Sequence, residues 1–203
     1  MCAQHREATK YAELAKRVLR LYPKSSLMEA KEGYGYRFES SPEDDRTWTN
    51  FRRQGYMTLL ELKGLSRWKT GGRQKANIVS NSQQAVKAVT CAATQVNSEV
   101  PNEPALPIGI LTSLHGVDIP TASTVMTVWE PQRFAILDIR VWQALGKAQS
   151  DAFRSITSKQ GNRRPFRPYE VALYLGVIRE VAAQTSLSCR EIDKALWVLG
   201  EAS

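Results

Sequence analysis

Residues 111–145 read LTSLHGVDIPTASTVMTVWEPQRFAILDIRVWQAL. This stretch predicts one helix that ends at a turn over residues 114–118 and a second helix that opens at Ile119. Gly116 suits a tight turn because glycine has no Cβ and adopts positive φ freely. Val117 would point back and fill the gap between the two helices. The turn would then present backbone N–H groups at the start of the second helix, where geometry and the helix dipole favour a phosphate.

The rest of the chain also reads as helices, without a convincing run of strands. Phe134–Leu137 is the one plausible extended piece, and it is too short to seed a sheet. Ser188 and Glu191 have the spacing of a capping box and open the last helix. The fold class that we predict is all-α. The expected helices are 7–22, 47–67 (interrupted at Gly55 or Gly64), 74–95 (with a break or cap around Asn81), 139–147, 168–183 and the C-terminal segment. A turn is expected over 69–73, and loops over 31–46, 96–107 and 155–168.

The composition of the 203 residues is that of an ordinary globular protein, with 42% hydrophobic and 24% charged residues. No apolar run approaches the roughly 18 residues of a membrane span, and the N-terminus lacks the apolar stretch of a signal peptide. The three cysteines are far apart and only two histidines exist, which excludes a disulfide framework, a cysteine-rich cluster and a His-rich metal site. We therefore expect no metal, no cofactor and no membrane, and a cytoplasmic, nucleoid-associated location.

The basic residues are concentrated in the first third of the chain. Residues 1–75 carry a net charge of +7, residues 76–150 carry −1, and residues 151–203 carry +2, within a total of +8. This distribution favours a polyanionic partner, because neutralising phosphates releases counterions and supplies much of the affinity for nucleic acid. A solvated basic surface without a partner is the alternative.

The hairpin resembles the helix-hairpin-helix motif, L-P-G-[VI]-G-x-x-[TV]-A, and a plain helical hairpin is the alternative. The residues that match are Leu114, Gly116, Val117, Thr121 and Ala122. Further along, residues 137–140 (LDIR) resemble the apolar-Asp-[VT]-[HR] segment that follows the hairpin in the helix-hairpin-helix DNA glycosylase superfamily, which includes endonuclease III. Here Asp138 lies 22 residues after Gly116.

The resemblance implies one domain over residues 1–203, built as a two-lobed helical bundle with a helix-hairpin-helix motif. Lobe one would cover about 25–145, and lobe two would combine the N-terminal helix with about 146–203. It also implies hydrolysis of the N-glycosidic bond of a damaged or modified base in double-stranded DNA. Asp138 would be the catalytic carboxylate that stabilises positive charge on the sugar or activates water. An aspartate at this place can also be a helix N-cap, and the two roles are compatible.

Two departures from the family pattern bear on the chemistry. Bifunctional members carry a nucleophilic lysine where this chain has Pro120, which has no amine to form a Schiff base. The resemblance is therefore to the monofunctional branch, without lyase activity and without an iron–sulfur cluster. Asp118 stands where the motif has its second glycine, and its charge would oppose a nearby phosphate by about 1 kcal/mol.

The predicted site residues fall into three groups. The catalytic residue is Asp138, and the expected base pocket includes Trp68 and Trp142. The residues expected to contact DNA are Gly116, Val117, Asp118, Thr121, Arg140, Lys69 and Arg73.

Two other functions remain open at this point. The first is a non-catalytic DNA-binding protein on the same scaffold, in which Asp138 is only a cap. The second is a helical interaction protein whose basic face meets an acidic protein. We expect a monomer, and the sequence leaves open which base is removed, in repair or in defence against modified foreign DNA.

Overall fold

The computed structural model describes residues 3–35, 49–71, 73, 75–148, 151–153 and 164–201, and across these ranges the regular structure is helical and without strands. The predicted all-α class is therefore confirmed for the described part of the chain. Residues 134–138 are neither helix nor strand. Residues 36–46 of the predicted loop over 31–46, and residues 155–163 of the predicted loop over 155–168, lie outside the described residues.

The chain forms two compact units. The terminal unit combines Met1–Glu39 with Leu137–Ser203, and the central unit is the continuous segment Ser40–Ile136. The division expected from the sequence had its boundaries near residues 25 and 145. In the structure the terminal unit is larger than expected and also includes the helices over 24–35 and 139–148. Both belong to it because both contact the C-terminal helix.

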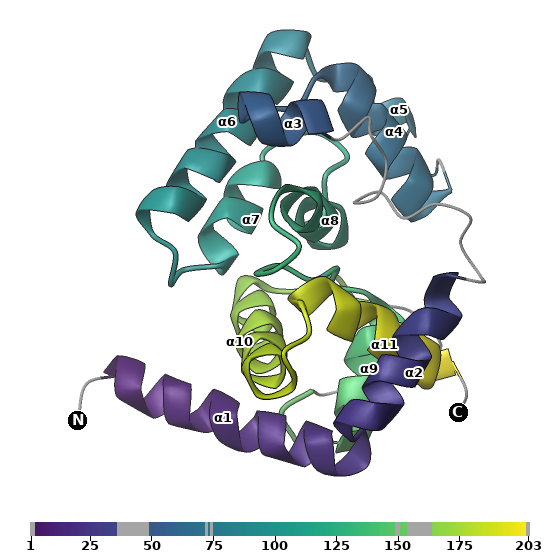
Figure 1. The fold of residues 1–203 in the computed structure, drawn as a ribbon. Helices are drawn as coiled ribbons and strands as arrows, with labels where there is room; N and C mark the ends of the chain where they lie inside the picture. Colours follow the sequence, from purple (N-terminus) through teal and green to yellow (C-terminus); the bar gives the residue numbers. More distant parts are fainter. Residues whose placement is uncertain are drawn as a thin grey trace. The chain divides into compact units, whose positions relative to one another are not determined.

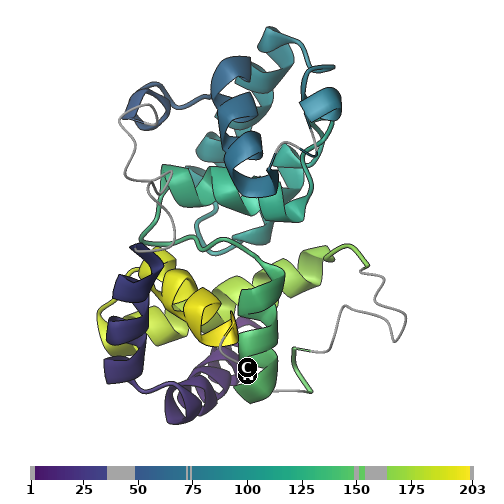
Figure 2. The same ribbon diagram turned by 90° about the vertical axis from the view of Figure 1, so that its right-hand side faces the viewer.

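The terminal unit is built from five of the described helices around a shared apolar core. Its helix α11 contacts both α2 and α9 and lies between them in Figure 2, while α1 runs along α10. Pro168 is the first residue of α10, as predicted. The helices are α1 (Ala3–Leu21), α2 (Lys24–Gly35), α9 (Ile139–Ala148), α10 (Pro168–Thr185) and α11 (Cys189–Glu201).

Helix α2 corrects part of the sequence prediction, which placed a loop over residues 31–46. Leu27, Ala30 and Tyr34 lie on one face of α2 and are all buried. The Tyr34 ring meets the Trp197 ring of α11 edge to face, with 5.5 Å between centroids. Burial of this face against α11 stabilises a segment whose glycines and polar residues favour a loop by themselves.

The predicted capping box at the start of α11 is confirmed. The backbone N–H of Ser188 donates to Glu191 Oε2 (2.8 Å), and the backbone N–H of Glu191 donates to Ser188 Oγ (3.1 Å). Lys31 of α2 binds the same glutamate at 2.6 Å. Burial raises the pKa of Glu191, but these hydrogen bonds and the charge of Lys31 outweigh it and leave the pKa below its ordinary value. The cap of α11 therefore also ties α11 to α2.

The central unit is arranged around α8. Residues 121–128 of α8 are all buried, and α8 contacts α3, α4 and α7, which surround it in Figure 1. Arg52 of α3 donates its Nε–H to the carbonyl of Val128 (2.6 Å) and so satisfies the C-terminal end of α8. The helices are α3 (Thr49–Gln54), α4 (Leu59–Thr70), α5 (Lys75–Ile78), α6 (Gln83–Glu99), α7 (Ala105–Leu111) and α8 (Ile119–Trp129).

The predicted helix over 47–67 is divided at Gly55, where φ is 78°, and Gly64 lies inside the continuous helix α4. Helix α6 holds this break in place. Thr90 Oγ1 accepts the N–H of Met57 (2.9 Å), and Thr94 Oγ1 donates to the carbonyl of Gly55 (2.7 Å). The backbone groups freed by the break are thus satisfied from another helix.

Candidate nucleic-acid site

The turn between α7 and α8 has the geometry predicted for it. Gly116 has φ of 74°, in the left-handed region that glycine enters without steric cost. Val117 is 5% exposed and its N–H donates to the carbonyl of Leu114 (3.1 Å). The valine therefore closes the gap between the two helices, as the sequence indicated.

Gly116 is also required by a close contact. A Cβ added at this position would lie 2.8 Å from Cβ of Asn77 and 3.0 Å from the backbone nitrogen of Ile78. Both atoms belong to α5, so the turn rests directly on the backbone of that short helix. Two independent constraints, the left-handed conformation and the lack of space, therefore call for glycine here.

Asn81 holds the turn from the side, and the sequence analysis missed it. Its Nδ2 donates to the carbonyls of His115 (2.9 Å) and Ile78 (3.0 Å), and its Oδ1 accepts the N–H of His115 (2.9 Å). The residue is 7% exposed. The sequence indicated only a helix break at Asn81, because nothing local marks a partner 34 residues away.

Asp118 is the N-cap of α8. Its Oδ1 accepts the N–H of Thr121 (2.9 Å), and its carbonyl accepts the N–H of Ala122 (2.8 Å). In the described part of the chain the N–H groups of Gly116, Asp118 and Ile119 donate to no other group. These N–H groups can donate hydrogen bonds to an anion. The exposed Asp118 carboxylate lies at the same helix end and already accepts the N–H of Thr121.

Thr121 is enclosed in the core of the central unit. It is 0% exposed, and its Oγ1 has no hydrogen-bond partner among the described residues. Because its side chain has no solvent-accessible surface, Thr121 cannot make the DNA contact that the sequence predicted. Its place in the motif is explained by packing of α8.

Asp138 lies at the head of α9, two residues into the returning segment of the terminal unit. Its Oδ1 accepts the N–H of Arg140 (3.0 Å), and its carbonyl accepts the N–H of Trp142 (2.9 Å). The side chain is half-buried. Asp138 therefore has the position of a helix N-cap, which was the structural role expected beside the catalytic one.

The terminal unit also contains buried polar side chains, and the charge of Asp138 acts on one of them. The pKa of the fully buried Tyr174 phenol lies well above its ordinary value, first because of burial and then because of the negative charges of Asp193 and Asp138. Asp193 forms a buried ion pair with Arg190, which also donates to the Tyr34 hydroxyl (3.1 Å). The Asp138 carboxylate is therefore close enough to Tyr174 for its charge to act on the buried phenol.

Arg140 and Trp142 are held by neighbouring rings. The guanidinium of Arg140 lies over the Trp197 ring, with 4.3 Å from its carbon to the centroid. Trp142 is 2% exposed and packs edge-on against Phe153 and Phe166, at centroid distances of 4.9 and 5.4 Å. Trp142 is a core residue, so the expected stacking of its ring on a base is not supported by its position.

The remaining predicted residues are at the end of α4. This helix ends at Thr70 with Gly71 in the left-handed region (φ 62°), so the chain turns at Gly71, within the predicted turn over 69–73, of which Gly72 lies outside the described residues. Trp68 and Lys69 are half-buried, and Arg73 is exposed. These residues and the hairpin belong to the central unit, whereas Asp138, Arg140 and Trp142 belong to the terminal unit.

Comparisons of the chain with known protein families, with curated proteins and with solved structures found no match. Among the described residues, no group of three or more His, Cys, Asp or Glu side chains is placed to hold a metal ion. None of the described helices combines the length and the apolar character needed to cross a membrane.

Proposed function

We propose that this protein binds double-stranded DNA through the α7–α8 hairpin and acts as a monofunctional DNA glycosylase on a damaged or modified base. The observation that carries the proposal is the hairpin with left-handed Gly116 and buried Val117, followed in sequence by half-buried Asp138 at the head of α9. The family resemblance of these segments supplies the reaction. With this function we also expect the protein to be a monomer in the cytoplasm, associated with the nucleoid.

The hairpin would hold the DNA backbone. The N–H groups of Gly116, Asp118 and Ile119 donate no hydrogen bond to any described residue. The dipole of α8 adds positive potential at the same end of the helix. Lys69 and Arg73 would add cationic contacts within the same unit. The Asp118 carboxylate makes this phosphate contact weaker than a second glycine would.

Asp138 would carry the chemistry. Breaking an N-glycosidic bond develops positive charge on the sugar, and a carboxylate near C1′ stabilises that charge or accepts a proton from the attacking water. At the place of the lysine nucleophile of bifunctional relatives, Pro120 offers no amine. Base release would therefore leave an intact abasic strand.

The test is base release from duplexes carrying uracil, alkylated, oxidised or hypermodified bases, with the wild type beside Asp138→Asn. Asparagine is also a good N-cap, so the variant keeps the acceptor for Arg140 N–H and should fold. Asp151→Asn, at an exposed aspartate of the same unit, is the matched control. Release by the wild type and the control, but not by Asp138→Asn, supports the enzyme, and scission should need alkali.

One observation favours a second candidate, a non-catalytic DNA-binding protein. The Asp138 carboxylate already has a structural task as the cap of α9. In that case DNA binding would be equal in the wild type and Asp138→Asn, and no base would be released from any duplex of the panel. Scission by the wild type without alkali would contradict the monofunctional reading of Pro120.

A further inference from the structure

Helix α1 presents a basic surface to the solvent. Between residues 10 and 20 of this helix the exposed residues are all charged, and they are Lys10, Glu13, Lys16, Arg17 and Arg20. Their spacing of three or four residues places them on one side of the helix. Four of the five are cations, so this side, which we call the α1 basic face, has a net charge of +3. It extends over about 15 Å of the helix axis.

The opposite side of α1 belongs to the core of the terminal unit. Leu14, Ala15 and Val18 are all buried. Tyr11 rests directly on α10, since a Cβ added at Gly176 would lie 2.7 Å from the Tyr11 ring. Figure 1 shows α1 running along α10, with no described helix of this unit on the other side of α1. Packing on α10 therefore fixes which side of α1 meets the solvent.

The single carboxylate of the α1 basic face leaves the cations accessible. Glu13 lies 3.7 Å from Lys16 Nζ and 3.9 Å from Arg17 Nε, and the three side chains are 49–60% exposed. Exposed ion pairs of this kind are weak and are screened by salt. In the part of the chain that the structure describes, Lys10 and Arg20 form no ion pair. A phosphate can therefore approach all four cations.

The chemistry of this face favours a nucleic acid over a membrane or a protein. A membrane-bound amphipathic helix inserts its apolar side into the lipid, and the apolar side of α1 is enclosed in the core. Protein interfaces are centred on apolar and aromatic side chains, and the exposed Leu21 comes only after the end of the face. Backbone contacts to DNA need cations alone, and about 15 Å of duplex presents several phosphates.

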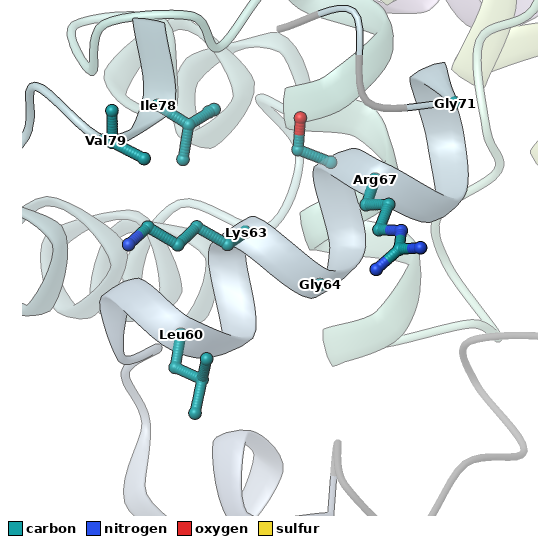
Figure 3. Close-up of a pocket in the computed structure, with 8 residues that line it drawn as sticks. Leu60, Lys63, Gly64, Arg67, Gly71, Ile78 and Val79 are labelled. Carbon is teal, nitrogen blue, oxygen red and sulfur yellow. The ribbon is translucent and has the colours of Figure 1, made fainter. Parts of the chain in front are cut away.

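Cations also line a cavity of about 600 Å³ beside α4 in the central unit. Figure 3 shows that the charged groups of Lys63 and Arg67 point in different directions from that helix. We therefore assign no shared phosphate to this pair, and the α1 basic face is the stronger candidate for an anionic partner.

We propose that the α1 basic face binds the phosphate backbone of duplex DNA, independently of base sequence. Its residues all belong to the terminal unit, so it is a second DNA-binding surface, distinct from the α7–α8 hairpin of the central unit. The choice of DNA over another polyanion rests on the proposed function. Contacts of this kind hold a protein on undamaged DNA and let it slide and hop along the duplex.

The experiment is titration of a short undamaged duplex with the full chain at several salt concentrations, followed by fluorescence anisotropy. Lys16→Gln with Arg20→Gln removes two cations of the face, and glutamine favours a helix about as much as they do. Arg53→Gln with Arg167→Gln, at exposed positions outside α1, is the charge-matched control. Glu13→Gln removes the one negative charge of the face. Far-UV circular dichroism checks that each variant is folded.

The α1 double variant should bind the duplex about tenfold or more weakly than the wild type, and its slope of log K against log salt should be smaller by about 2. The control should bind like the wild type. Glu13→Gln should bind more tightly although it loses two ion pairs, which a purely structural role of these residues does not predict.

Three results would overturn the proposal. The first is an unchanged salt slope in the folded α1 double variant. The second is an equal loss of affinity in the control, which would show an effect of total charge. The third is binding to phosphatidylserine vesicles, but not to the duplex, that depends on Lys16 and Arg20, which would assign the face to a membrane surface.

Failure here is distinguishable from failure of the proposed function. Base release that depends on Asp138, with wild-type duplex affinity in the α1 double variant, removes the second surface and keeps the glycosylase. Duplex binding that depends on Lys16 and Arg20, without release of any base from the duplex panel, keeps the α1 basic face and removes the enzyme.

Discussion

Replacement of Gly116 by alanine tests the hairpin most directly. The structure gives two costs for this change. Holding an L-residue at φ of 74° costs about 1–2 kcal/mol. The new Cβ would also lie 2.8 Å from Asn77 Cβ and 3.0 Å from the backbone of Ile78, and relieving such overpacking costs about 1–3 kcal/mol. We therefore expect Gly116→Ala to lower the free energy of unfolding of the central unit by about 2–5 kcal/mol.

Two other glycines of the same unit separate these costs. Gly71 has φ of 62° but nothing within 4 Å of an added Cβ, so Gly71→Ala should lose only the conformational term, about 1–2 kcal/mol. Gly109 is helical, exposed and has nothing within 4 Å of an added Cβ, so Gly109→Ala should gain about 0.5–1 kcal/mol.

The assay is urea unfolding of the three variants and the wild type, followed by far-UV circular dichroism and by hydrogen exchange of the central unit. The expected order of stability is Gly109→Ala, wild type, Gly71→Ala and Gly116→Ala. A Gly116→Ala protein as stable as Gly71→Ala would show that the turn does not press on α5. One as stable as the wild type would refute the left-handed turn itself.

Three further predictions follow from single groups. Thr121→Val replaces a buried hydroxyl without a partner by a methyl group of similar shape, so the free energy of unfolding should rise by about 1 kcal/mol. Urea denaturation measures this change, and a loss of stability would show that Oγ1 has a hydrogen-bond partner. Lys69→Gln and Arg73→Gln should each reduce the slope of log K for duplex DNA against log salt by about 1, while an unchanged slope would remove that residue from the interface. For Glu170, burial raises the pKa, but hydrogen bonds from Arg164 and from the Arg167 N–H outweigh it, and the net pKa is below the ordinary 4.5. Because the pKa of Glu170 is lower in the folded protein than in the unfolded one, its carboxylate stabilises the fold above pH 4.5. This stabilisation is lost as the pH falls through the pKa of the folded protein. Wild-type stability should therefore drop more steeply below pH 4.5 than that of Glu170→Gln. Parallel acid denaturation curves for the two proteins would contradict this assignment.

The sequence by itself determined the features that depend on neighbouring residues. The capping box of Ser188 and Glu191, the first turn of α10 at Pro168 and the turn at Gly71 after α4 each involve groups within a few positions of one another. The hairpin turn is of the same kind, because Gly116 and Val117 specify it through φ and through apolar character. Such interactions are encoded locally, so their residue types are visible in the sequence.

Only the tertiary structure decided which side chains are enclosed and what they meet. Trp142 and Thr121 became core residues because helices distant in sequence cover them, and α2 became a helix because α11 packs on it. Asn81 became the clamp of the hairpin through a partner 34 residues away. Burial and hydrogen bonds across such separations arise from packing of whole helices, which composition and spacing along the chain do not record.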